Sequence, residues 1–161
     1  MEKLKTYFKS NYIFYIIATV VIALDLLTKH LLTNKHIVLI EGVVSFYYSE
    51  NTGAAFSMFS NNTILLIFVS VFLLIAIILF KNLVKHKPHI LFTFAYPLII
   101  GGAIGNLFDR IFLGYVRDFV SLDFINFAIF NFADTCLCIG FVLLAIYLVF
   151  VDFKDEKNKV N

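Results

Sequence analysis

Two aspartates, Asp118 and Asp134, have the residue type and setting that acid–base catalysis requires. Asp118 stands between apolar neighbours, Val116, Phe119 and Val120, where a carboxylate has no obvious local structural role. Two carboxylates that share one proton can divide the work of hydrolysis. The ionised group takes a proton from water, and the protonated group donates one to the bond that is cut. This pair therefore indicates aspartic-type hydrolysis.

Signatures of other catalytic chemistries are missing from the sequence. There is no Gly-x-Ser-x-Gly and no His-Glu-x-x-His, and the four histidines lie away from any recognisable motif. Cys136 and Cys138 are two residues apart in an apolar stretch. On a helix they would point to different faces, where they cannot bridge each other, so they fit small apolar filler best. Nucleophilic Ser or Cys catalysis and a zinc site are poor fits.

The composition shows which kind of fold must position these aspartates. Hydrophobic residues make up 61% of the 161 residues and charged residues 15%, whereas soluble domains contain about 45–50% and about 25%. A domain of this size cannot hide so much apolar surface from water. Disordered proteins, secreted disulfide scaffolds and nucleic-acid-binding domains are thereby excluded, and a lipid bilayer is the expected solvent.

Four apolar stretches are long enough to cross a hydrocarbon core, which takes about 20 helical residues. We expect helices over about 12–32, 64–80, 90–108 and 133–151, the second with Ser70 as its single polar residue. Residues 1–161 should form one integral membrane domain. The first stretch follows basic residues, as in a secretory signal, but no small-x-small cleavage site follows it, so we expect it to be retained.

The basic residues predict the orientation of these helices. Nine of the 13 Lys and Arg residues lie on one side of the expected spans: Lys3, Lys5, Lys9, Lys81, Lys85, Lys87, Lys154, Lys157 and Lys159. The positive-inside rule then places both termini in the cytoplasm and residues 33–63 and 109–132 outside. Both outer connections are rich in aromatic residues, so we expect short strands or an interfacial helix at the membrane surface.

This topology gathers polar residues at the outer end of the bundle. Asp25 and Lys29, four residues apart on one helix face, can form an ion pair there. The other polar residues expected at this end are Asn51, Asn106, Asp109, Arg110, Asp118, Asn131 and Asp134. Polar groups at membrane depth are costly and usually functional, so the gathering indicates a site.

Most members of this set also have a structural interpretation when they are taken singly. The Asp25–Lys29 pair could only stabilise its helix, and Asn131 with Asp134 three residues later resembles a helix start, with a cap and an acid in the first turn. The Gly101-x-x-x-Gly105 spacing is typical of close helix packing. Asp118 has no such alternative interpretation.

Five motifs occur in order along the chain: Asp25-x-x-x-Lys29, Asn51-Thr-Gly-Ala-Ala-Phe-Ser57, Gly101-Gly-Ala-x-Gly-Asn106-x-x-Asp109-Arg110, Val116-Arg-Asp118-Phe119 and Phe130-Asn131-x-Ala-Asp134. Together with four spans, they resemble the bacterial lipoprotein signal peptidase family, also called signal peptidase II. The resemblance covers about residues 12–150. A minor departure is Leu26, where many members carry a polar residue.

The resemblance implies a multi-pass aspartic endopeptidase of the bacterial cytoplasmic membrane, with its active site towards the extracytoplasmic face. Such enzymes remove the signal peptide from diacylglyceryl-modified prolipoproteins, cutting before the lipidated cysteine with an Asp dyad and an activated water. Residue by residue, it implies catalytic roles for Asp118 and Asp134 and substrate binding by Asn51, Asn106, Arg110 and Asn131. It implies supporting roles for Asp25, Lys29, Gly53, Gly105 and Asp109.

The resemblance also implies an all-α membrane fold: a four-helix bundle with a small β-rich extracytoplasmic platform and an interfacial connecting segment. It implies no metal or other cofactor, contact with membrane lipids, and inhibition by globomycin-like peptides. We expect no nucleic-acid partner and, without an apolar heptad seam, a monomer. The alternatives are a small ion-coupled transporter, which four spans without an inverted repeat make a poor fit, and a membrane scaffold without enzymatic activity.

Overall fold

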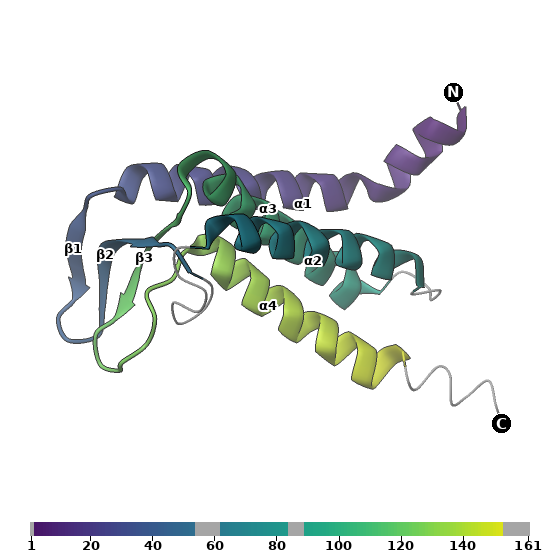
Figure 1. The fold of residues 1–161 in the computed structure, drawn as a ribbon. Helices are drawn as coiled ribbons and strands as arrows, with labels where there is room; N and C mark the ends of the chain where they lie inside the picture. The colour runs from purple at the N-terminus through teal and green to yellow at the C-terminus, as the bar shows by residue number, and fades with distance from the viewer. Residues whose placement is uncertain (1, 54–61, 84–88, 153–161) are drawn as a thin grey trace.

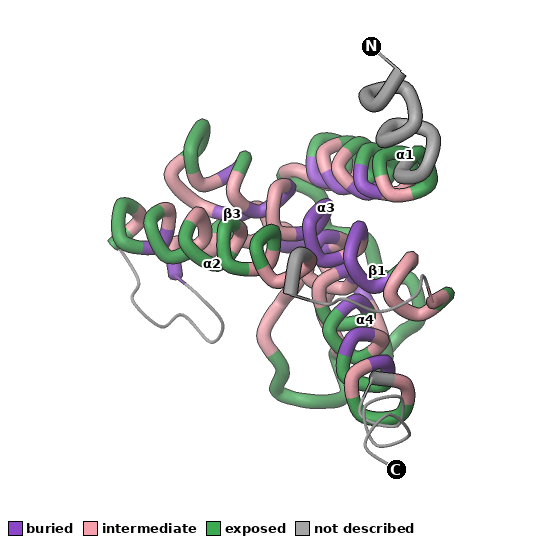
Figure 2. Tube along the Cα trace, turned by 90° about the vertical axis from the view of Figure 1, so that its right-hand side faces the viewer, coloured by how far each residue is buried: buried purple, intermediate pink, exposed green. Residues whose placement is uncertain are grey.

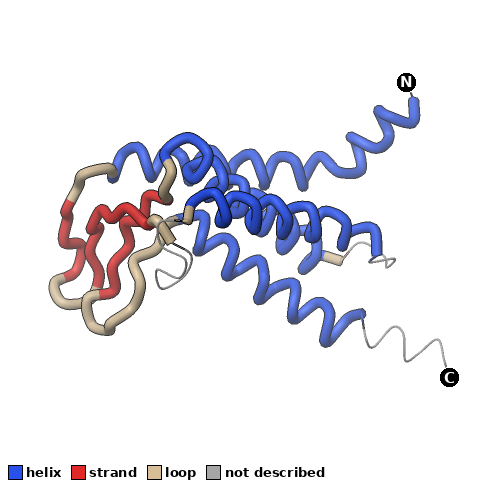
Figure 3. Tube along the Cα trace, in the orientation of Figure 1, coloured by secondary structure: helices blue, strands red, loops and turns tan. Residues whose placement is uncertain are grey.

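The computed structural model describes residues 2–53, 62–83 and 89–152 of the chain. Its elements, in order, are α1 (Glu2–Leu32), β1 (His36–Ile40), β2 (Val44–Asn51), α2 (Thr63–Leu83), α3 (Ile90–Leu113), β3 (Val116–Leu122), α4 (Phe132–Tyr147) and the π-helical turn η2 (Leu148–Asp152). The four long helices lie side by side, and the three strands lie at one end of the bundle (Figure 1, Figure 3).

All four predicted spans are confirmed. The segments Tyr12–Leu32, Thr63–Lys81, Ile90–Leu113 and Phe132–Val151 are each long and apolar enough to cross a membrane. The predicted end of the third span, at residue 108, was wrong by five residues. The helix continues because Asp109 is buried among partners at this end of the bundle. It ends where Gly114 takes a left-handed conformation (φ 85°) and its N–H bonds to the carbonyl of Arg110.

The two connections at the sheet end form one antiparallel sheet in the order β1-β2-β3, which confirms the β-rich platform. Strand β2 pairs with β3 so that Ser49 is opposite Asp118 and Asn51 is opposite Val116. Residues 123–131, which follow β3, run without helix to the start of α4, so no interfacial helix forms there. Residues 54–61 of the other connection lie outside the described part of the chain.

Helix α3 is the central element and packs against α1, α2 and α4; it carries more buried residues than any other described helix (Figure 2). Small residues allow this packing, as the Gly101-x-x-x-Gly105 spacing predicted. A Cβ atom added at Gly101 would lie 2.8 Å from the Cβ of Val21 on α1. The outward faces are apolar, with Phe68 and Phe72 of α2 more than two-thirds exposed, as expected for side chains that contact lipid.

An apolar core fills the half of the bundle far from the sheet. Ala95, Ile99, Leu144 and Tyr147 form this core between α3 and α4, and the ring of Phe92 stacks on that of Tyr96 with 5.5 Å between centroids. The buried charged and amide side chains, by contrast, are found in the half near the sheet. The bundle therefore has an apolar end and a polar end, and α1 begins and α4 ends at the apolar one (Figure 1).

Candidate active site

One residue, Asn131, hydrogen-bonds to both predicted catalytic aspartates. Asp118 lies on β3 and Asp134 lies in the first turn of α4. The side-chain amide of Asn131 donates to Asp118 Oδ1 (2.7 Å), and its backbone N–H donates to Asp134 Oδ2 (3.1 Å). The fold thus brings together two carboxylates that are separated in the sequence by a strand and a loop.

The start of α4 explains how Asp134 is held. The Asn131 side-chain oxygen accepts from the Asp134 N–H (2.9 Å), while Asp134 accepts from the Asn131 N–H, so the two residues form a reciprocal capping box. The predicted helix start is confirmed, and the structure adds a second bond, in which the Asp134 carboxylate accepts from the Asn131 N–H. One oxygen of this carboxylate therefore satisfies the helix end, and the other is available to the site.

Two further amides hold the remaining carboxylate oxygens. Asn106 of α3 donates to Asp134 Oδ1 (2.7 Å), and Asn51 at the end of β2 donates to Asp118 Oδ2 (2.9 Å). The orientation of the Asn51 amide is set by its oxygen, which accepts from the N–H of Gly53 (2.9 Å). Each of the four carboxylate oxygens consequently has one amide donor, and neither aspartate can turn freely.

Asp118 is a carboxyl group that retains its proton unusually well. Burial is the main cause and the negative charge of Asp134 adds to it, so the pKa of Asp118 is raised to about 7. Hydrogen bonds from Asn51 and Asn131 and the charge of Lys29 act in the opposite direction, but they do not cancel the effect. At neutral pH a large share of the molecules therefore carry a proton on Asp118.

A fully buried cation lies behind this pair. The ammonium of Lys29 donates to Asp25 (2.8 Å) and to the Asn106 side-chain oxygen (3.0 Å), and it lies 3.4 Å from Asp109. The other oxygen of Asp25 accepts from the N–H of Ala133 in the first turn of α4 (3.0 Å). The predicted Asp25–Lys29 ion pair is confirmed as a contact, and it reaches the start of α4 as well as the amide that holds Asp134.

Gly105 leaves the space that the Asp25 carboxylate occupies. A Cβ atom at this position would overlap the Oδ2 atom of Asp25. A residue with a side chain would therefore displace the carboxylate that bonds to Lys29. The absence of a side chain at Gly105 thus allows Asp25 to keep its place in the polar network.

Arg117 is a part of the site that the sequence analysis did not identify. Its guanidinium bonds to both oxygens of Asp109 (2.7 and 3.2 Å), and its backbone N–H bonds to the same carboxylate (3.0 Å). These bonds fasten β3 to α3 directly before Asp118. A signal was present in the sequence, because a carboxylate at membrane depth needs a cation and Arg117 adjoins the motif aspartate.

Arg110 lies at the same end with spare hydrogen-bonding capacity. One terminal nitrogen donates to the carbonyl of Gly53 (3.3 Å), and the guanidinium interacts electrostatically with both Asp134 and Asp118. Its Nε atom is buried and has no hydrogen-bond partner among the described residues. The structure therefore brings Arg110 and Gly53 to the site, as predicted, and leaves one donor unused.

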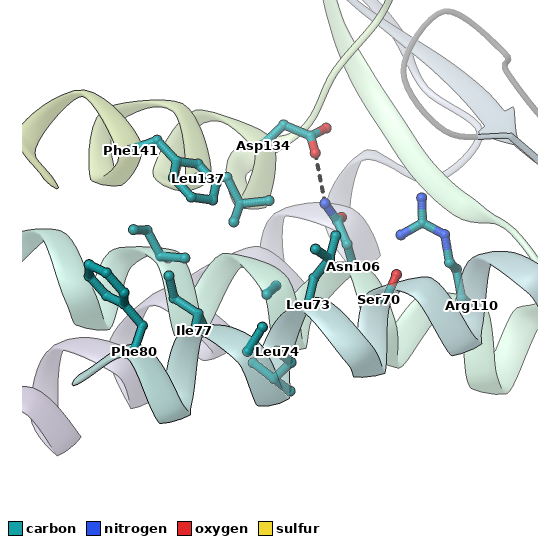
Figure 4. Close-up of a pocket in the computed structure, with 13 residues that line it drawn as sticks. Ser70, Leu73, Leu74, Ile77, Phe80, Asn106, Arg110, Asp134, Leu137 and Phe141 are labelled. Atoms are coloured by element: carbon teal, nitrogen blue, oxygen red, sulfur yellow. Dashed lines mark hydrogen bonds between the residues drawn. The ribbon is translucent and has the colours of Figure 1, made fainter. Parts of the chain in front are cut away.

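A cavity of about 490 Å³ lies beside Asp134, between α2, α3 and α4. One end is polar, with Asn106, Arg110, Asp134 and Ser70 (Figure 4). The rest is apolar and is lined by Leu73, Leu74, Ala76, Ile77, Phe80, Ile99, Ala103, Leu137 and Phe141. An apolar pocket with a few convergent polar groups is typical of ligand sites. In the sequence, Ser70 stands out only as the single polar residue of its span.

The described residues contain no group of three or more His, Cys, Asp and Glu side chains that could hold a metal ion. The two cysteines are not part of the site: Cys136 is buried in α4 and Cys138 is exposed, on different sides of the helix as predicted. The two carboxyl groups, each oriented by amide donors, are arranged so that they can take up and donate protons.

Comparison with protein families gives one match that spans most of the chain. The family described as signal peptidase (SPase) II matches residues 17–150. A lipoprotein signal peptidase of Lactobacillus johnsonii is 40% identical over 153 residues, which cover 91% of this chain and 99% of the relative. One of Streptococcus agalactiae is 42% identical over 149 residues, which cover 89% of this chain and 93% of that relative.

Solved structures give the same picture of the fold. A structure described as a bacterial membrane enzyme, solved at 2.3 Å resolution, superposes with a TM-score of 0.78 at 29% identity, covering 91% of this chain and 90% of the other. A second one, at 1.9 Å resolution, has a TM-score of 0.75 at 28% identity and covers 86% and 93% of the two chains.

Proposed function

Because the chain belongs to the signal peptidase II family of aspartic-type peptidases, we propose that it removes signal peptides from diacylglyceryl-modified prolipoproteins with Asp118 and Asp134 as its catalytic pair. The chain is a multi-pass membrane hydrolase of this family. The proposal adds the two aspartates, the activated water and cleavage before the lipidated cysteine.

The observation that carries the proposal is the double contact of Asn131. Because this residue donates to Asp118 and to Asp134, the two carboxyl groups lie close together, and Asp134 also lines the polar end of the apolar cavity. That arrangement suits a scissile peptide bond that emerges from an apolar segment. A water between the two groups could reach the carbonyl carbon of that bond.

The raised pKa of Asp118 supports an assignment of the two roles. Asp118 is the acid and holds the shared proton, and ionised Asp134 is the base. The water oxygen attacks the carbonyl carbon while Asp134 takes a proton from this water. At the same time Asp118 protonates the carbonyl oxygen. When the C–N bond breaks, Asp134 passes its proton to the leaving amine, and Asp118 recovers one from the hydroxyl of the intermediate, so the starting state returns.

The bundle supports a matching position for the substrate. The polar end of the cavity faces the sheet, and its apolar lining runs towards the opposite end of the bundle. The signal segment lies along this lining, and the acyl chains stay in the bilayer. With the termini in the cytoplasm, the site is near the extracytoplasmic face of the bacterial cytoplasmic membrane, which the distribution of Lys and Arg supports.

The test is cleavage of a diacylglyceryl prolipoprotein by the purified protein in lipid nanodiscs, followed by gel shift. Asp118→Asn and Asp134→Asn are nearly isosteric and should each lower the rate by about a thousandfold or more. Asp123→Asn is the matched control: Asp123 is exposed and accepts from Ser45 and Ser121 outside the site, so its rate should stay within about twofold of the original.

A globomycin-like peptide should block the same cleavage. If either dyad variant cleaves the substrate at the original rate, the assignment of that aspartate is wrong. If the unaltered protein does not cleave, the proposed reaction is wrong, and an ion-coupled role for the carboxylates would have to be considered.

A further inference from the structure

Ser70 is the one polar residue of α2 between Ile64 and Phe80, and it faces the cavity beside Arg110 and Asp134 (Figure 4). A serine hydroxyl in a helix commonly bonds to the carbonyl one turn earlier. Ser70 has no such bond and no other hydrogen-bond partner among the residues that the structure describes. Its hydroxyl is therefore available to a molecule in the cavity.

Ser70 is not the only unused polar group at this end of the cavity. The Nε atom of Arg110 is buried without a partner among the described residues. An unsatisfied buried donor is costly and calls for an explanation. Two unused groups on facing helices, α2 and α3, at the polar end of one cavity are explained by a ligand that bonds to both.

A peptide that is about to be cut presents backbone groups that can serve as hydrogen-bond partners for these two side chains. Near the scissile bond the chain must leave the helical conformation, and its N–H and C=O groups then lose their partners. At membrane depth no bulk water replaces them, and each unsatisfied group is costly. The aspartates act on the scissile bond itself, so the neighbouring peptide groups need other partners.

We propose that Ser70 is a substrate-binding residue whose hydroxyl, together with Arg110, hydrogen-bonds to the backbone of the signal peptide directly before the scissile bond. This inference rests on the proposed function. We assign the bond to the segment before the scissile bond because the apolar lining begins next to Ser70, at Leu73 and Leu74. From there the lining runs away from the sheet. The apolar part of the signal peptide lies in that direction.

The first experiment compares Ser70→Ala with Ser70→Thr, which keeps the hydroxyl. Ser70→Ala should lower kcat/KM about threefold to tenfold, the range expected for one hydrogen bond, and Ser70→Thr should retain at least about half. Thr93→Val is the control: it removes a hydroxyl that bonds to the carbonyl of His89 at the start of α3 (3.0 Å). Thr93 does not line the cavity, so this change should leave kcat/KM unchanged.

The second experiment locates the bond with substrates in which single backbone amides before the cut are replaced by esters. At one position the ester should lower kcat/KM for the unaltered enzyme but cause little further loss in Ser70→Ala. This coupling is not expected if Ser70 only supports the packing of α2. If Ser70→Ala reduces the amount of folded protein, Ser70→Cys, which has a similar size and a weak donor, replaces it under the same criteria.

Two results would overturn the inference: unchanged kcat/KM in Ser70→Ala, or equal ester effects in Ser70→Ala and the unaltered enzyme at every position. Both require an active starting enzyme. They are therefore distinct from failure of the proposed function, in which the unaltered protein leaves the prolipoprotein uncut.

Discussion

The ammonium nitrogen of Lys29 lies 3.0 Å from the side-chain oxygen of Asn106, and together with the Asn131 amide, which donates to the same oxygen (3.0 Å), it fixes which way the Asn106 amide faces. A lysine can only donate hydrogen bonds, so the amide oxygen must point to it. The amide nitrogen is thereby directed at Asp134, 2.7 Å away. A buried cation on α1 thus orients a donor to the proposed catalytic pair without hydrogen-bonding to either aspartate.

Removing Lys29 alone should destabilise the protein, because the Asp25 carboxylate would remain buried without its cation; such losses are about 3–5 kcal/mol. The informative comparison is therefore between Asp25→Asn/Lys29→Gln and Asp25→Asn/Lys29→Met. Both pairs lack the two charges, but only Gln can donate to Asn106. We expect kcat to be about tenfold higher with Gln. Equal kcat values would show that a donor at residue 29 adds nothing to the orientation that Asn131 already gives Asn106.

The pKa of Asp118, raised to about 7 by burial and by the charge of Asp134, gives a pH dependence of defined sign. Asp118 must be protonated to act as the acid, and the protonated fraction falls as the pH rises above 7. The value of kcat/KM should therefore decline on the alkaline side, approaching tenfold per pH unit. Initial rates of cleavage across neutral and alkaline pH test this. A rise of kcat/KM through pH 7 would instead identify Asp118 as the base.

Gly105→Ala and Gly101→Ala form a matched pair at the contact between α1 and α3. Both added Cβ atoms meet α1 closely, but the one at Gly105 meets the Asp25 carboxylate and the one at Gly101 meets the apolar side chain of Val21. Both should destabilise the folded protein by about 1–3 kcal/mol through overpacking, which is seen as a lower melting temperature. Only Gly105→Ala should also lower kcat of the folded fraction. Similar kcat values for the two variants would argue against transmission through Asp25.

The bidentate pair of Arg117 with Asp109 should affect catalysis through the position of β3. Arg117→Gln loses the fork that fastens the strand directly before Asp118, and we expect kcat to fall about tenfold. In the double variant with Asp109→Asn, the combined loss should be smaller than the sum of the separate ones by about 0.5–3 kcal/mol. Additive losses would indicate that the two residues act independently.

Local patterns in the sequence were sufficient to predict the spans, the β-forming run in the first outer connection and the cap of α4, while the β-rich platform as a whole was predicted from the family resemblance. Each depends on residues that are close in the chain: apolar length, β-forming runs, and Asn131 three residues before Asp134. The end of α3 was predicted wrongly for the same reason. The sequence shows charges at Asp109 and Arg110, but not the partners that let a helix continue through them.

The connections within the site could not be predicted, because they join residues that are far apart in the chain. Asp25 bonds to Ala133 and Lys29 bonds to Asn106 only after α1, α3 and α4 have packed. The use of Asn131 as a bridge between two aspartates depends on the approach of β3 to the start of α4. The sequence pattern and the predicted topology indicated which residues gather at one end of the bundle. The hydrogen-bond partner of each residue is seen only in the packed structure.

The position of Asp134 on the last helix has a consequence for the synthesis of the enzyme. Chains are made and inserted from the N-terminus, so a nascent chain with three spans already contains Asp118, Asn106 and Lys29 but lacks the second carboxylate and its cap. On the proposed mechanism, such an intermediate cannot hydrolyse a peptide. On this mechanism, the order of the helices delays proteolytic activity until the fourth helix has been inserted.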